Sequence, residues 1–141
     1  MKSNLKVYTS FVSPLSFPEF IEKGLLPIFI VRSIIGSKLI GHYEGSPVHM
    51  KKLAPSGGLF RKKRDGLITN DEFKKLYAIE LTKISLEDVV RDLEMLAEVS
   101  GASGIVLLGY GSNRNDCHRS VLSEVLNNSD LLEHKVKEIL V

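Results

Sequence analysis

The chain has one cysteine, no tryptophan and no apolar run long enough to cross a bilayer. A membrane-spanning helix needs about 20 consecutive apolar residues, and the longest stretch here, Leu25 to Val31, is interrupted by Pro27. The first residues lead into a strand-like segment without a signal-peptide core. A lone cysteine cannot form an internal disulfide, which fits a reducing compartment. We therefore expect a cytoplasmic protein with no membrane partner.

Metal ligands and nucleotide-binding motifs are also scarce. The four histidines lie far apart, without the i, i+4 pair of helical zinc sites, at positions His42, His49, His118 and His134. One cysteine excludes a Cys-rich zinc site. The sequence contains no Walker motif, dinucleotide fingerprint or Gly-x-Ser-x-Gly elbow. We therefore expect no bound metal and no resident cofactor.

The remaining composition is that of an ordinary globular protein. Of the 141 residues, 43% are hydrophobic and 26% are charged, with a net charge of +2. This length fits one domain with one core, so we predict a single domain over residues 1–141. The net charge is too small to require a polyanionic partner, and the distribution of charge matters more than its total.

Hydrophobic patterns predict that strands and helices alternate along the chain. Strands are expected at 5–10, 27–33 and 104–109, and the last two are continuous apolar runs typical of strands covered on both faces. Residues 136–141 could form a closing strand. The first thirty or so residues have the size of a βαβ unit. The predicted fold is a compact α/β domain with a mostly parallel central sheet flanked by helices, a Rossmann-like three-layer arrangement.

Capping signals locate the helices. Ser16 can begin a short helix that stops at Gly24, and Thr69 with Glu72 forms a capping box for the next. A further helix begins at Ser85 and stops at Gly101, and a last one covers about 116–126. Residues 36–68 are rich in glycine and proline, with a helical turn expected at 59–64.

Ligand crevices in parallel α/β sheets lie beyond the carboxyl ends of the strands. We hypothesise that three strand ends meet at one crevice, which would hold these candidate ligand contacts: Tyr8, Thr9, Ser10, Arg32, Ser33 and Tyr110, with Asn113 in the glycine-bounded loop that follows. The alternatives are that residues 8–10 simply finish a strand, that Arg32 forms a structural ion pair, and that Tyr110 packs against the sheet.

The junction Asp116-Cys117-His118-Arg119-Ser120 joins the last apolar strand to a helix. The first turn of a helix carries free N–H groups and the positive end of its dipole, which favour anions and lower the pKa of a thiol. A phosphate or carboxylate could bind there with Arg119. Cys117 and His118 are the candidate catalytic residues, although neighbouring helical residues point about 100° apart. That geometry favours anion capture over a direct cysteine–histidine couple.

Other interpretations of the same residues remain open. Cys117 could pack in the core, His118 could be solvated, and Arg119 could pair with Glu124 or another acid. Arg61 to Arg64, with Lys51 and Lys52 nearby, could contact nucleic-acid phosphates or form a solvated surface. A protein-interaction module without chemistry is a third possibility.

Several segments occur in the order seen in a known family. They are Val7 to Ser10, the strand ending in Arg32-Ser33, Lys52 to Ser56, the helix with Phe73, Tyr77 and Glu80-Leu81, and the block Leu107 to Tyr110 with Cys117 to Ser120 and Leu126. Together they resemble the family named domain of unknown function 488, from about Val7 to Leu126. The Leu-Ala-Pro-Ser and Cys-His-Arg-Ser segments are the most specific.

This resemblance implies a compact α/β domain and brings no established activity. The signature positions of the family would be Tyr8, Ser10, Arg32, Ser56, Tyr110, Cys117, His118 and Arg119. Ser56 joins the candidate ligand contacts through the resemblance alone. The family often has a cysteine where this chain has Gly109, so a paired-cysteine mechanism is not expected. The predicted partner is a small anionic or nucleotide-like ligand, with nucleic acid as the alternative.

Overall fold

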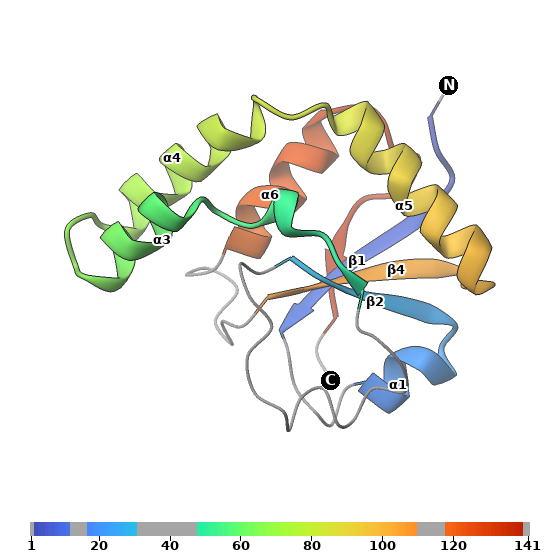
Figure 1. The fold of residues 1–141 in the computed structure, drawn as a ribbon. Coiled ribbons are helices and arrows are strands. Elements are labelled where there is room, and N and C mark those ends of the chain that lie inside the picture. Colours follow the sequence, from blue (N-terminus) through green and yellow to red (C-terminus); the bar gives the residue numbers. More distant parts are fainter. Residues whose placement is uncertain (1, 12–16, 31–47, 110–117, 140–141) are drawn as a thin grey trace.

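A five-stranded parallel sheet forms the centre of the protein (Figure 1). The structure, a computed structural model, describes residues 2–11, 17–30, 48–109 and 118–139. The strand order is β3-β2-β4-β1-β5. The strands are β1 (Lys6–Phe11), β2 (Leu25–Phe29), β3 (Val48–His49), β4 (Gly104–Gly109) and β5 (Lys137–Glu138).

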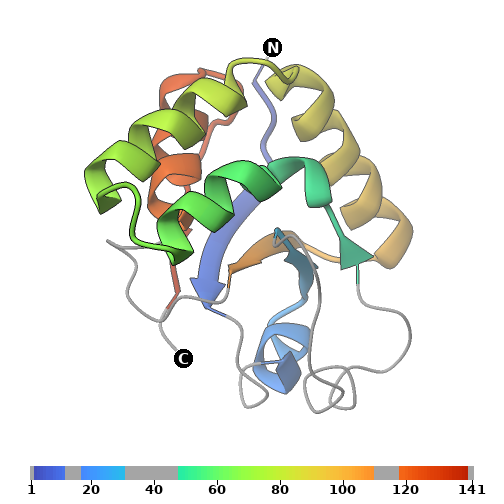
Figure 2. The same cartoon turned by 60° about the vertical axis from the view of Figure 1, so that its left-hand side comes forward.

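Helices cover both faces of this sheet. The described helices are α1 (Phe17–Glu22), the 3-10 turn η1 (Lys51–Leu53), α3 (Gly57–Arg64), α4 (Asn70–Leu81), α5 (Leu86–Ser100) and α6 (His118–Asn128). Helix α1 lies on one face, and α4, α5 and α6 lie on the other (Figures 1 and 2). The predicted three-layer α/β fold with a parallel central sheet is therefore confirmed.

Strand β4 is the centre of the core because all six of its residues are buried. Its side chains alternate between the two faces, as the pleat of a strand requires. Ile105 and Leu107 belong to the larger apolar cluster, which α4, α5 and α6 also supply. Val106 and Leu108 belong to a smaller cluster that includes Phe20 of α1. Burial on both faces explains why this strand is a continuous apolar run.

The capping signals at Thr69, Ser85, Gly24 and Gly101 are confirmed, whereas Ser16 lies outside the described residues. The hydroxyl of Thr69 accepts from the N–H of Glu72 at 3.1 Å, and the Glu72 carboxylate accepts from the N–H of Thr69 at 3.0 Å. Gly24 and Gly101 have φ angles of 75° and 72°, a left-handed conformation that glycine adopts without a Cβ penalty. Both glycines follow the ends of helices, α1 and α5 respectively.

Strand β2 differs from the predicted 27–33 because it begins two residues earlier, at Leu25, and ends at Phe29; Pro27 lies within it. Proline lacks the N–H that a central strand must donate. Here β3 pairs with β2 only at Ile28 and Phe29, so the strand is unpaired on that side at Pro27 within the described residues. The proline therefore stands at a position where a missing donor is tolerated.

The described part of residues 36–68 contains short elements rather than one long loop. They are β3, η1 and α3, and α3 begins at Gly57, two residues before the predicted helical turn. Ser56 is its N-cap, and its hydroxyl accepts from the N–H of Leu59 at 3.2 Å. This cap extends the helix beyond the turn that the apolar pattern indicated.

The capping box makes helix α4 sensitive to acid. Hydrogen bonds from the backbone and side chain of Thr69 hold the pKa of Glu72 below its usual range. A depressed carboxyl pKa stabilises the fold above the unfolded-state pKa, and the stabilisation is lost as pH falls through the folded-state pKa. Wild type should therefore exceed Glu72→Gln in stability by more at pH 7 than at about pH 3. Urea unfolding at both values measures the gap, and a gap independent of pH would contradict the assignment.

Candidate functional site

The carboxyl ends of β1, β2 and β4 lie at one edge of the sheet, as the sequence predicted for these strands. They end at Phe11, Phe29 and Gly109, and β4 pairs in parallel with both neighbours. Helix α6 begins near this edge (Figure 1). Five of the predicted site residues lie outside the described residues: Arg32, Ser33, Tyr110, Asn113 and Cys117. The predicted site residues that the structure describes are Tyr8, Thr9, Ser10, Ser56, His118 and Arg119.

The residues at the end of β1 divide between the two faces of the sheet. Tyr8 is half-buried and packs with the smaller apolar cluster. Thr9 and Ser10 are fully buried. The hydroxyl of Thr9 donates to Glu138 Oε1 at 2.5 Å, and that of Ser10 donates to the carbonyl of Ile139 at 2.8 Å. Both hydroxyl groups therefore fasten β5 and the residue after it to β1.

Arg119, in the first turn of α6, is held by a fully enclosed ion pair. Its side chain is 0% exposed and that of Glu138 is 8% exposed. Arg119 Nη2 lies 3.0 Å from Glu138 Oε2, and Nη1 donates to the carbonyl of Gly109 at 3.2 Å. Removing charges from water is unfavourable unless they are well paired. The pair therefore fixes the first turn of α6 against the end of β4 and against β5.

The sequence predicted Arg119 as a ligand contact, with an ion pair to Glu124 or another acid as the alternative. The structure shows an ion pair with another acid, Glu138, and Glu124 is exposed on α6. The contact of Arg119 with a ligand stays a prediction. Glu138 was missed because it lies in a strand of only two residues. The available signal was an acidic residue between the apolar Val136 and Ile139 in a segment predicted to be a strand.

His118 is the first residue of α6 and is buried, with 9% exposure. Its Nε2 lies 2.7 Å from the carbonyl oxygen of Ile30, and a carbonyl only accepts, so Nε2 carries the hydrogen. Its ring meets Tyr77 edge-on, with centroids 5.5 Å apart. Tyr77 in turn donates to the carbonyl of Leu53. His118 therefore joins α6, α4 and the end of β2, and the alternative of a solvated His118 is wrong.

Ser56 belongs to the helical layer among the described residues. Its N–H donates to Glu80 Oε1 at 2.9 Å, and its hydroxyl donates to the other oxygen of the same carboxylate. These bonds attach the start of α3 to α4. The contact with a ligand that the resemblance implied for Ser56 stays a prediction.

A comparison with protein families adds one match. The family model described as "Active DUF488-N3 subclade" matches residues 37–130, more than half of the chain. The chain belongs to the DUF488 family. No curated protein and no solved structure matches it.

The DUF488 match includes Arg119 but not its partner Glu138. The buried His118 and the exposed Ser56 also lie within the match, whereas Thr9 lies before its start. In this DUF488 protein, the hydrogen-bonded residues Thr9 and Glu138 therefore come from the two sides of the matched range.

Two further observations concern the described part of this DUF488 protein. Among residues 2–11, 17–30, 48–109 and 118–139, no group of three or more histidine, cysteine or acidic side chains could hold a metal ion. No helix in these ranges is long and apolar enough to span a membrane.

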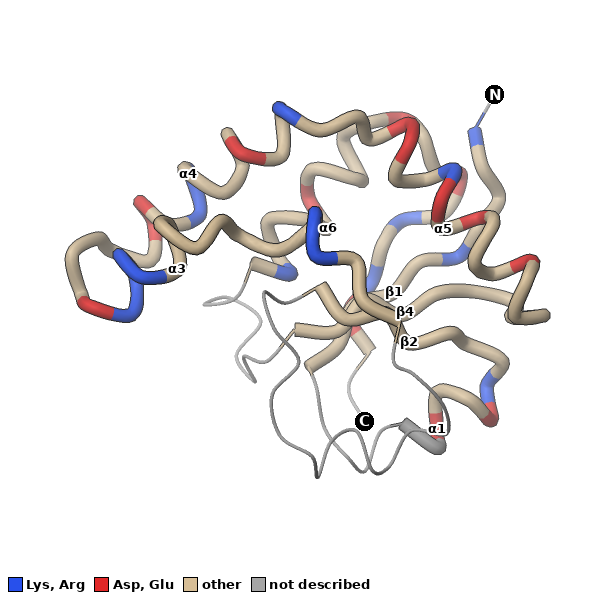
Figure 3. Tube along the Cα trace, viewed as in Figure 1, with Lys and Arg blue, Asp and Glu red and all other residues tan. Residues whose placement is uncertain are grey.

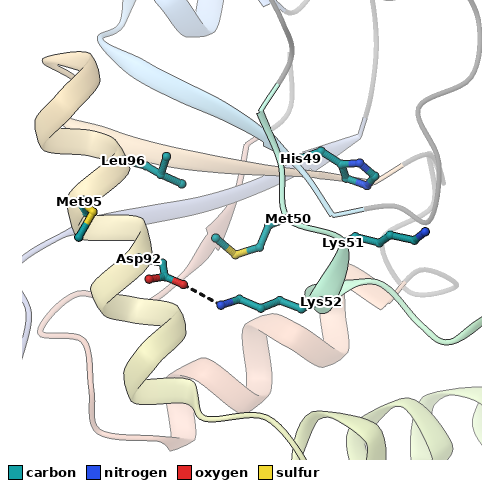
Figure 4. A pocket seen from close by; sticks show the side chains of 7 residues that line it. All are labelled: His49, Met50, Lys51, Lys52, Asp92, Met95 and Leu96. Carbon is teal, nitrogen blue, oxygen red and sulfur yellow. Dashed lines mark hydrogen bonds and ion pairs between the residues drawn. The ribbon is translucent and has the colours of Figure 1, made fainter.

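A separate hollow lies between β3, η1 and α5 (Figure 4). An ion pair of 2.7 Å between Lys52 and Asp92 joins its two sides. Strands β3 and β5 are the two outermost strands of the sheet. The hollow lies beside β3, whereas Glu138 is in β5 on the opposite side of the sheet. Its lining residues are His49, Met50, Lys51, Lys52, Asp92, Met95 and Leu96. We assign no ligand to it.

Proposed function

We propose that this DUF488 protein binds a small anionic ligand, phosphorylated or nucleotide-like, at the carboxyl edge of its sheet where α6 begins. One observation carries the proposal: the buried pair of Arg119 and Glu138 fixes the first turn of α6 at that edge. The first N–H groups of a helix have no partner within the helix. Together with the helix dipole they favour an anion at this end.

In this proposal Arg119 mainly positions the turn. Its guanidinium is enclosed, forms an ion pair with Glu138 and donates a hydrogen bond to the Gly109 carbonyl. In this proposal the backbone of the first turn is therefore the part that meets the anion. Arg32, Ser33, Tyr110 and Asn113 remain proposed ligand contacts, since they follow the ends of β2 and β4 in the sequence. Tyr8, Thr9 and Ser10 are proposed to shape the binding surface at the carboxyl ends of the strands.

If the ligand is chemically converted, the proposed catalytic residues are Cys117 and His118. Cys117 directly precedes α6 in the sequence, where the helix dipole would favour a thiolate. His118 uses Nε2 for Ile30, so a proton could pass to or from a ligand only through Nδ1. The description of the matched subclade as active supports including turnover in the proposal. The single cysteine, which cannot form an internal disulfide, supports a cytoplasmic location in this proposal.

Thermal unfolding with added ligands tests this proposal. The probes are inorganic phosphate, AMP and ribose 5-phosphate at equal ionic strength. A ligand at 100 times its Kd stabilises the native state by about 2.7 kcal/mol, which corresponds to a rise in Tm of several degrees for a chain of this size. At least one probe should produce such a rise. If all three leave Tm unchanged at millimolar concentration, the proposal is wrong.

A pair of charge variants locates the binding. Cys117→Asp adds a carboxylate before α6, where aspartate is a good capping residue but repels an incoming anion. Asn128→Asp adds the same charge at the far end of α6, where Asn128 is exposed. We expect Cys117→Asp to lose most of the ligand-induced rise in Tm and Asn128→Asp to keep it. Equal rises in both variants would place the ligand elsewhere.

A further inference from the structure

Helices α3 and α4 form a hairpin that projects from the body of the protein, on the side to which the strand arrows of β1 and β4 point (Figures 1 and 2). The last turn of α3 has four consecutive cationic residues, Arg61 to Arg64 (Figure 3). This is the densest run of like charge in the sequence.

The residues of α3 separate into an inner and an outer side. Leu59 is buried in the core and Lys63, four residues later, has its Nζ 4.5 Å from the ring centroid of Phe73. Phe60 and Arg64 are also four residues apart, and Arg61 is three before Arg64, so these three share the outer side. All three are exposed.

The cations on this side, and the exposed Lys62 next to Arg61, are available to a ligand. Within the described part of the chain, Arg61 and Lys62 form no ion pair. Arg64 Nε lies 3.2 Å from Asp65, but both side chains are more than half exposed, and such surface pairs contribute little. A phosphate can therefore replace Asp65 at small cost.

Phe60 adds an exposed aromatic ring, which a basic turn that only faces solvent has no reason to contain. Its side chain is 48% exposed, next to Arg61 and on the same side as Arg64. An exposed aromatic ring between cations suits a base that stacks while its phosphates meet the charges. The buried Leu59 and the bonds from Ser56 to Glu80 hold α3 in place beneath it.

Charge is also separated across the molecule. Helix α5 exposes mainly acidic residues, with Arg91 as the cation among them: Glu87, Asp88, Glu94 and Glu98. The net charge of +2 therefore conceals a basic α3 and a mainly acidic α5 (Figure 3). A polyanion would be repelled from α5 and attracted to α3.

We propose that the outer side of α3, made of Phe60, Arg61 and Arg64, binds single-stranded nucleic acid together with the exposed Lys62 at its flank. The three cations contact successive phosphates and Phe60 stacks on a base. This surface is separate from the ligand proposed at the start of α6, so it adds a second binding activity to the protein.

Fluorescence anisotropy with labelled 12-nucleotide dT and U strands tests the proposal. The variant Arg61→Gln/Lys62→Gln/Arg64→Gln should bind at least about tenfold more weakly than wild type. The slope of log affinity against log salt should fall by about two, since each lost phosphate contact on a single strand contributes about 0.7. The control, Lys23→Gln/Lys83→Gln/Lys135→Gln, removes the same charge from exposed lysines elsewhere and should keep its affinity within about twofold.

Phe60→Ala separates stacking from charge. It should weaken single-strand binding about fivefold or more, with an unchanged salt slope, and should leave binding of a 12-base-pair duplex unaffected. The proposal is overturned if wild type binds neither strand at low salt, or if both triple variants lose affinity equally. It is also overturned if vesicles with anionic headgroups compete fully for the same surface, since the partner would then be a membrane. Unchanged thermal unfolding of each variant checks that folding is intact.

Discussion

Replacing Glu138 with alanine should lower the free energy of unfolding by about 3–5 kcal/mol, the range seen when one member of a buried ion pair is removed. The reason is Arg119, whose side chain is 0% exposed and would keep its charge without the carboxylate beside it. Thr9 would also lose the acceptor of its hydroxyl. Urea unfolding followed by circular dichroism measures the change.

Two matched variants show whether charge burial is the cause. Glu133→Ala removes an exposed acid from the same C-terminal segment and should change stability by about 0.5 kcal/mol or less. The double variant Arg119→Met/Glu138→Leu removes both charges and should recover most of the loss, because apolar replacements of a whole buried pair are often neutral. A loss below about 1 kcal/mol for Glu138→Ala would mean that the pair does not fix α6.

Leu122→Ala should lower the free energy of unfolding by about 2–5 kcal/mol, as expected for a leucine truncated in a close-packed core. Leu122 is 0% exposed and lies on the inward side of α6, within the larger apolar cluster. Removing it leaves a cavity beneath the helix that begins at the proposed site. The same urea measurement applies.

Leu67→Ala is the control for this substitution because Leu67 is 72% exposed. It removes the same atoms at the surface and should change stability by about 0.5 kcal/mol or less. If Leu122→Ala were equally mild, α6 would not be packed on the sheet as described, and the position of its first turn would lose its support.

Local signals in the sequence predicted most of the fold. The capping box at Thr69, the stops at Gly24 and Gly101 and the apolar run of β4 depend on neighbouring residues or on burial of both faces of one strand. Such features can be predicted from the sequence because the residues that cause them lie within a few positions of one another. The shared edge of β1, β2 and β4 then followed from their parallel direction.

The interior of the site could not be predicted in this way. The partner of Thr9 is Glu138, 129 residues away, and nothing local to either residue indicates the other. Strands β3 and β5 have two residues each, too few to show a periodic pattern. Arg119 looked like a residue that meets ligand, and its burial depends on the closing strand that brings Glu138 to it.

The two proposed surfaces differ in how a ligand would be held. The edge at α6 is fixed by buried charges, and the ligand proposed there is one compact anion. The outer side of α3 has exposed cations and an exposed aromatic ring, which suit a flexible strand. The variants at Cys117 and at Arg61, Lys62 and Arg64 therefore test them independently.

The central claim is that an anion binds at the first turn of α6, and a ¹⁵N–¹H NMR titration with inorganic phosphate and with AMP tests it most directly. We predict that the amide signals of His118, Arg119 and Ser120 shift together and saturably, while that of Asn128 at the other end of the helix stays in place. Saturable binding that moves only amides elsewhere, such as His49 beside the hollow near α5, would contradict the claim.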